Sequence, residues 1–290
     1  MSSLPKSSLR LLYRIGWRLG PRLPAWLQPP LVRAGSRLVM WRRPAALEVL
    51  RTNLEVAADR PVGDRLVLQA VESYARMLVE AFTLPGWSPT EVTSRVVTTG
   101  EQHLRGAFAS VGAVVALPHS GNWDLAGAWA CLTAMPVSTV AERLPSVEFA
   151  AFLRFREGLG MQVLAHDDPK AMSKLVEAVG DGRLVCLVSD RDLGGTGVPV
   201  RWGRSGVEVR MPAGPAVVAR RSGGALVPAV CSYRGSQMLI AFGPPIPNQE
   251  GREGLTAMTQ QVADFFADQI AGRPQDWHMM QPFFTRPAAT

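Results

Sequence analysis

The sequence is poor in the residues that build metal sites and disulfide frameworks. Its 290 residues include three cysteines, and no C-x-x-C spacing occurs. The four histidines are scattered, without an H-E-x-x-H pair. An odd number of cysteines within apolar runs indicates buried, reduced thiols in an intracellular protein. We therefore expect neither a metal site nor a disulfide framework.

Long apolar runs are also missing. No stretch reaches the ~18 uninterrupted apolar residues of a transmembrane helix. No long apolar segment with a cleavage site follows the first residues, so no secretory signal is predicted. With 47% hydrophobic and 19% charged residues, the chain can nevertheless bury a substantial core.

Acidic residues do not occur before Glu48, whereas residues 1–43 contain a block of lysine and arginine. Such a block typically meets nucleic acid or an anionic membrane. Arg10, Arg14 and Arg18 lie one helical turn apart among Leu, Ile, Tyr and Trp, a pattern typical of a helix on a membrane surface. A nucleic-acid helix more often carries Asn, Gln or Ser beside its arginines. We therefore expect residues 1–43 to meet an anionic membrane and no nucleic acid; an ordinary surface helix is the alternative.

Hydrophobic periodicity divides the chain into a helical part, residues 1–85, and an α/β part, residues 86–290, which we expect to form one continuous domain. In the first part, helices are predicted at 9–19, 31–41 and 66–82, the last with Asp64 as its N-cap. Strands and helices then alternate, which predicts a mostly parallel central sheet wrapped by helices. The strands are predicted at 95–98, 113–117, 137–140, 162–164, 184–188, 225–232 and 237–242, and the helices at 103–110, 123–132, 147–159, 169–179, 215–222 and 255–271.

Polar side chains follow three of the predicted strands. His119 follows strand 113–117, with Asp124 five positions later. Glu142 follows strand 137–140, and Asp190 follows strand 184–188. Ligands bind at the carboxyl ends of strands in open α/β sheets. His119 is therefore a candidate general base, oriented by Asp124 or Asp190. The structural alternative is a histidine that caps the following helix.

The sequence offers no obvious nucleophile. Ser120 lies outside any G-x-S-x-G elbow and directly follows its would-be base. We therefore expect direct chemistry, in which His119 deprotonates a substrate hydroxyl that attacks an electrophile.

Arginines near the predicted strand ends suit a phosphate-rich ligand. They are Arg156, Arg210, Arg220 and Arg221. Solvated charges that complement helix C-termini are the alternative, and this alternative is stronger for the last two than for Arg210.

The run from Ala116 to Asp124, ALPHSGNWD, contains the H-x4-D pattern of glycerolipid acyltransferases. It resembles the actinobacterial phosphatidylinositol mannoside acyltransferases, relatives of the lipid A acyltransferases. The resemblance covers nearly the whole chain, including the basic N-terminus. It continues in order through residues 140–144, 156–160, 190–193, 210–216 and 276–279.

This resemblance implies a reaction and a place for it. An acyl group, with palmitoyl-CoA as the donor, would pass to a mannose hydroxyl of a phosphatidylinositol mannoside. The protein would be peripheral, at the cytoplasmic face of the plasma membrane, and would need no cofactor. The residues alone also allow a different glycolipid or lysophospholipid acceptor, or an acyl-CoA or lipid-ester hydrolase. A lipid- or nucleic-acid-binding module is disfavoured by the carboxylates at the strand ends.

The resemblance also implies roles for individual residues. His119 would be the base and Asp190 its relay carboxylate, while Asp124 would orient the histidine or the sugar. Glu142 would contact the acceptor. With Arg210 added from the charge pattern, the residues expected at the acyl donor are His119, Arg156, Thr196, Arg210 and Arg221.

Overall fold

The computed structural model describes residues 16, 19–141, 147–192 and 194–284, with the side chains of 147–152 excepted. Within them, seven strands form one sheet in the order β1-β9-β8-β2-β5-β3-β4. Neighbours pair in parallel except β8 and β9, which form an antiparallel hairpin. The strands are β1 Val96–Thr99, β2 Ala113–Leu117, β3 Val137–Ala141, β4 Gln162–Ala165, β5 Leu184–Val188, β8 Ala225–Arg234 and β9 Gln237–Phe242.

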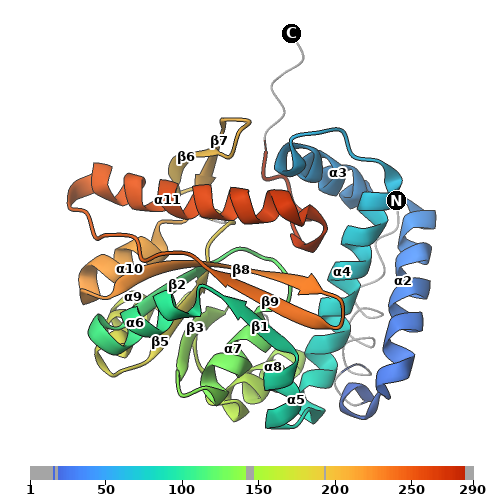
Figure 1. Ribbon diagram of the computed structural model, residues 1–290, viewed down its shortest axis with the longest axis horizontal. Helices are drawn as coiled ribbons and strands as arrows, with labels where there is room; N and C mark the ends of the chain where they lie inside the picture. Colours follow the sequence, from blue (N-terminus) through green and yellow to red (C-terminus); the bar gives the residue numbers. More distant parts are fainter. Residues whose placement is uncertain (1–15, 17–18, 142–146, 193, 285–290) are drawn as a thin grey trace.

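The sheet is covered on both faces, as a mostly parallel sheet requires. Alternate residues of β2 enter different cores: Val114 and Ala116 belong to one, and Ala113, Val115 and Leu117 to the other. Helices α9 Ala171–Gly180, α10 Gly214–Ser222 and α11 Gly251–Gly272 contribute to the first core. The second is completed by α5 Pro89–Ser94, α6 Glu101–Val111, α7 Trp123–Leu132 and α8 Val147–Gly158. Figure 1 shows α11 on one side of the sheet and α5, α7 and α8 on the other.

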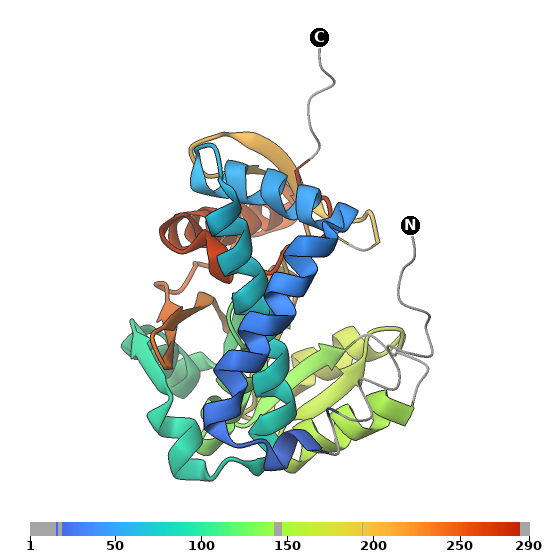
Figure 2. The ribbon, with the colours of Figure 1, turned by 90° about the vertical axis from the view of Figure 1, so that its right-hand side faces the viewer.

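The N-terminal helices pack beside one end of the helix-covered sheet. Helix α2 Gln28–Arg42 runs along α4 Asp64–Thr83 (Figure 2), and α3 Ala45–Ala58 packs nearby. Leu50, Leu54 and Val67 form a small third core there. Asn53 of α3 donates hydrogen bonds to the carbonyl oxygens of Met279 (2.9 Å) and Gln281 (2.7 Å). The remaining short helices are η1 Gly20–Arg22, η2 Ala25–Leu27, η3 Leu84–Gly86 and η4 Pro274–Asp276.

The predicted fold class, a mostly parallel sheet wrapped by helices, is confirmed. The bounds of β2 and α7 are those predicted, whereas α4 begins at Asp64 itself and Gly63 occupies the N-cap position. The division of the chain at residue 85 stays a prediction, and most of the predicted helix at 9–19 lies outside the described residues. No described helix combines the length and hydropathy needed to cross a bilayer.

The structure contains an antiparallel hairpin that was not predicted, β6 Val198–Trp202 paired with β7 Val207–Met211. Its strands alternate inward and outward residues, and Trp202 and Met211 are buried in the core that α11 also lines. That alternation was a usable signal for a ribbon with one buried face.

Candidate active site

Strand register places His119 beside Asp190. Strands β2 and β5 are parallel neighbours, and Leu117, the last residue of β2, pairs with Val188, the last of β5. His119 and Asp190 each follow two positions later, so both lie at the same edge of the sheet. The predicted convergence of these two strand tips is what the structure contains.

The Asp190 carboxylate contacts His119 through both of its oxygens. One oxygen contacts the imidazole Nδ1 at 2.5 Å, and the other accepts a hydrogen bond from the His119 backbone N–H at 2.9 Å. Burial alone would raise the pKa of Asp190, which has no exposed surface, but the adjacent His119 and the N–H donors hold that pKa below its ordinary value. The His119 side chain is 22% exposed, so substrate can reach its ring.

Residues 276–278 form a second wall around the pair. The Gly121 N–H donates to the Asp276 carbonyl oxygen at 2.9 Å, and the His278 N–H donates to the His119 carbonyl oxygen at 2.7 Å. The indole N–H of Trp277 donates to Asp190 at 2.9 Å. No role was predicted for these residues, although the family resemblance extends through 276–279.

His278 is a neutral neighbour of the pair. Burial, and then the nearby His119, lower its pKa to about 3. Its Nε2 lies 3.2 Å from the Ser73 hydroxyl, which donates to the Asp276 carboxylate at 2.7 Å. This bonding joins helix α4 to the wall behind His119.

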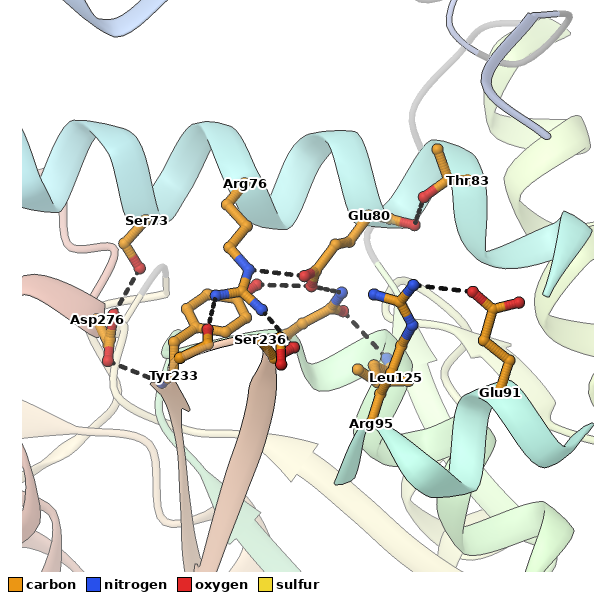
Figure 3. A network of polar contacts seen from close by, with 12 residues as sticks. Ser73, Arg76, Glu80, Thr83, Glu91, Arg95, Leu125, Tyr233, Ser236 and Asp276 are labelled. Atoms are coloured by element: carbon orange, nitrogen blue, oxygen red, sulfur yellow. Dashed lines mark hydrogen bonds and ion pairs between the residues drawn. The ribbon is translucent and has the colours of Figure 1, made fainter. Parts of the chain in front are cut away.

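A buried polar network makes a second connection from α4 to residues 118–122, the loop between β2 and α7 that carries His119 and is called the histidine loop below (Figure 3). The Glu80 carboxylate accepts hydrogen bonds from Arg76 Nε (2.7 Å), the Tyr233 hydroxyl (2.8 Å) and Asn122 Nδ2 (3.0 Å). The Asn122 side-chain oxygen accepts from the Leu125 N–H at 3.0 Å and so caps α7. Because the Asn122 amide is bound through both its groups, the start of α7 is fixed relative to α4.

Asp124 is paired with an arginine and not with the histidine. Its carboxylate accepts a hydrogen bond from Arg156 Nε of α8 at 2.6 Å, and both side chains are more than nine-tenths buried. Of the two carboxylates proposed to orient His119, Asp190 is therefore the one in contact. Asp124 instead carries an ion pair between α7 and α8.

That ion pair lines an apolar pocket. The pocket encloses about 570 Å³, including the space at its mouth. Its walls come from β2, β5, β9, α6, α7 and α8, with Leu117, Val188 and Trp123 among the lining residues. The Trp123 ring stands edge-on to the His119 imidazole, with 5.4 Å between ring centroids. Trp123 therefore connects the lining of the pocket with the imidazole.

Thr196 and Arg210 lie close to each other. The Thr196 N–H donates to Asp192 at 3.2 Å, and Arg210 donates to the carbonyl oxygen of Gly197 at 2.5 Å. Asp192 is two residues beyond Asp190, so this exposed cluster follows the same strand tip. It presents one arginine side chain, 56% exposed, to solvent.

One predicted site residue, Arg221, is not brought to this group. Arg221 is at the end of α10, just before β8, and Ala225 at the start of β8 bonds to Gly112 before β2. Arg221 therefore lies toward the opposite edge of the sheet from His119, and its role stays a prediction. Glu142 lies outside the described residues. Among the described residues, no group of three or more His, Cys, Asp or Glu side chains is arranged to hold a metal ion.

The fold and the histidine motif place the protein among the acyltransferases. The family model described as "Bacterial lipid A biosynthesis acyltransferase" matches residues 2–286, and the chain belongs to this family. A phosphatidylinositol mannoside acyltransferase of Mycolicibacterium smegmatis is 39% identical over 277 residues, 93% of this chain and 89% of the relative. Relatives of the same name from two Mycobacterium tuberculosis strains are 37% identical over 290 residues, 97% of this chain and 90% of each relative.

Proposed function

We propose that the protein transfers a fatty acyl group, palmitoyl in particular, from acyl-CoA to a mannose hydroxyl of a phosphatidylinositol mannoside. The observation that carries the proposal is the His119–Asp190 pair beside an apolar pocket, in a member of an acyltransferase family. The names of the mycobacterial relatives support this acceptor.

The geometry supports His119 as the general base. Asp190 is ionised and faces Nδ1, so the imidazole keeps its Nδ1 proton and Nε2 carries the lone pair. Nε2 takes the proton of the sugar hydroxyl while that oxygen bonds to the thioester carbonyl carbon. When the carbon–sulfur bond breaks, the imidazolium returns the proton to the thiolate, which leaves free CoA. The Asp190 carboxylate stabilises the imidazolium in between.

The pocket suits the acyl chain. Apolar side chains from the sheet and helices line it, and burial of methylene groups there contributes about 0.8 kcal/mol each. The Asp124–Arg156 pair on the wall would meet the polar end of the chain or the acceptor sugar. Arg210 and Thr196 would meet the CoA phosphates, because a guanidinium group binds phosphate well.

The acceptor and the reaction type are tested together by mass spectrometry. Purified protein is incubated with palmitoyl-CoA and a panel of mannosylated phosphatidylinositols, lysophospholipids and lipid A precursors. We expect one added palmitoyl group on the mannosylated lipids. A product on another acceptor alone would overturn the proposed substrate, and equal consumption of acyl-CoA without acceptor would indicate a hydrolase.

The described part of the basic segment supports peripheral binding to an anionic membrane, which we propose to be the cytoplasmic face of the plasma membrane. Leu31, Leu38 and Trp41 lie on one side of α2 and are at least half exposed, and Trp26 precedes them in η2. Arginines flank these apolar side chains, as in interfacial helices. They are Arg22, Arg33, Arg37, Arg42 and Arg43.

Replacing both exposed tryptophans should weaken membrane binding. The double variant Trp26→Ala/Trp41→Ala removes two large apolar side chains from the bilayer interface, so we expect affinity for phosphatidylserine-containing vesicles to fall at least about tenfold. Vesicle sedimentation measures this. Val111→Ala, which alters an exposed apolar residue on α6, is the matched control. Equal sedimentation of the double variant and the wild type would rule out this surface.

A further inference from the structure

Trp277 makes a contact that the proposed chemistry does not yet use. Its indole N–H donates at 2.9 Å to the Asp190 oxygen that also accepts the His119 backbone N–H. Asp190 and Trp277 are almost completely buried, with exposed fractions of 0% and 1%. A hydrogen bond to a buried carboxylate is stronger than one between neutral groups.

The indole cannot readily leave this position. Trp277 stacks on Trp202 of β6 at 5.4 Å between ring centroids, and Phe283 and Phe284 stand edge-on to it. Its backbone forms a β-bridge with Ser120, the residue after His119. The N–H is therefore aimed at Asp190 by packing and by the backbone together.

We propose that Trp277 is a positioning residue that fixes the Asp190 carboxylate so that its other oxygen faces His119 Nδ1. Without the indole donor, the carboxylate keeps its two contacts with His119 but loses the hydrogen bond that restrains it from the side of Trp277. The proposal deepens the proposed function and rests on it, because Trp277 acts on the reaction only through Asp190 and His119.

The test is a double-mutant cycle on acyl transfer. Trp277→Phe keeps a buried aromatic ring and removes the N–H, and we expect kcat to fall about tenfold with KM unchanged. In an Asp190→Asn background, measured by single turnover, the same change should have little further effect, because the group it positions is gone. Trp202→Phe is the matched control: it alters the same aromatic cluster but keeps a ring against Trp277 and keeps the donor to Asp190, so we expect a smaller loss of kcat than in Trp277→Phe.

A second measurement needs no substrate. The chain has four histidines, so ¹³C labelling of their rings allows His119 to be titrated by NMR in the full protein. In Trp277→Phe the Asp190 carboxylate is held less firmly against the ring and stabilises the imidazolium less, so the His119 midpoint should move downward relative to the wild type. His278 faces the same pair but stays neutral, with a pKa of about 3.

The outcomes separate this proposal from the proposed function. An unchanged kcat in Trp277→Phe, an equal loss in the Asp190→Asn background, an equal loss in Trp202→Phe or an unmoved His119 titration would each overturn the role of Trp277. A wild-type protein without acyl transfer would instead overturn the proposed function, and the titration would still report on Trp277.

Discussion

His119→Ala should lower the rate of acyl transfer at least about 10³-fold, because the sugar hydroxyl then attacks the thioester without a base. Asp190 contacts Nδ1 of the imidazole, and the His278 N–H donates to the His119 carbonyl oxygen, so both the ring and the backbone of the base are held in place. The rate is measured as palmitoylated product per unit time at saturating donor and acceptor. His103→Ala, on helix α6, is the control for loss of a histidine and should keep the wild-type rate.

Asp190→Asn tests the contribution of the carboxylate to the His119–Asp190 pair. An amide that donates to Nδ1 moves the ring proton to Nε2, which then has no lone pair for the hydroxyl proton, and we expect a loss of about 10²–10⁴-fold. The pKa of Asp190 is lowered in the folded protein, so the wild-type carboxylate is charged throughout the neutral range. A wild-type rate in either variant, with folding verified by circular dichroism, would exclude the pair as the catalytic base.

Arg156→Met should destabilise the fold by about 3–5 kcal/mol, because it leaves the Asp124 carboxylate buried without its guanidinium partner. The free energy of unfolding is measured by urea titration. The double variant Asp124→Leu/Arg156→Met removes both charges and should recover much of the loss.

An exposed ion pair provides the control for the Arg156→Met prediction. Lys174 contacts Asp168 at 2.7 Å on the surface, and Lys174→Met should leave the free energy of unfolding nearly unchanged. If the double variant were as unstable as Arg156→Met alone, the cost would come from lost packing and not from the unpaired charge.

The central part of the site was predictable because it depends on local patterns. The apolar run 113–117 defines β2, and Asn122 caps α7, so the position of His119 at a strand tip follows from short stretches of sequence. Asp190 follows a second apolar run, and parallel pairing of the two strands brings both tips together.

The parts that could not be predicted depend on contacts between distant segments. Asp124 lies only five positions after His119 in the sequence, yet its partner is Arg156, 32 positions later. The Trp277–Asp190 bond joins positions 87 apart, and the Glu80–Asn122 bond joins α4 to the histidine loop. No short pattern specifies such pairs, because they depend on how helices and strands pack.

The hydrogen bonds between the first helices and the last residues also set an order of assembly. Asn53 and Ser73 bond to partners more than 200 positions later in the chain. During synthesis from the N-terminus, α3 and α4 therefore emerge long before residues 276–281, and their polar groups stay hydrated until those residues arrive. The wall of residues 276–278 around His119 and Asp190 is completed as one of the last events of folding, so a nascent chain carries the whole H-x4-D motif well before it has an assembled catalytic centre.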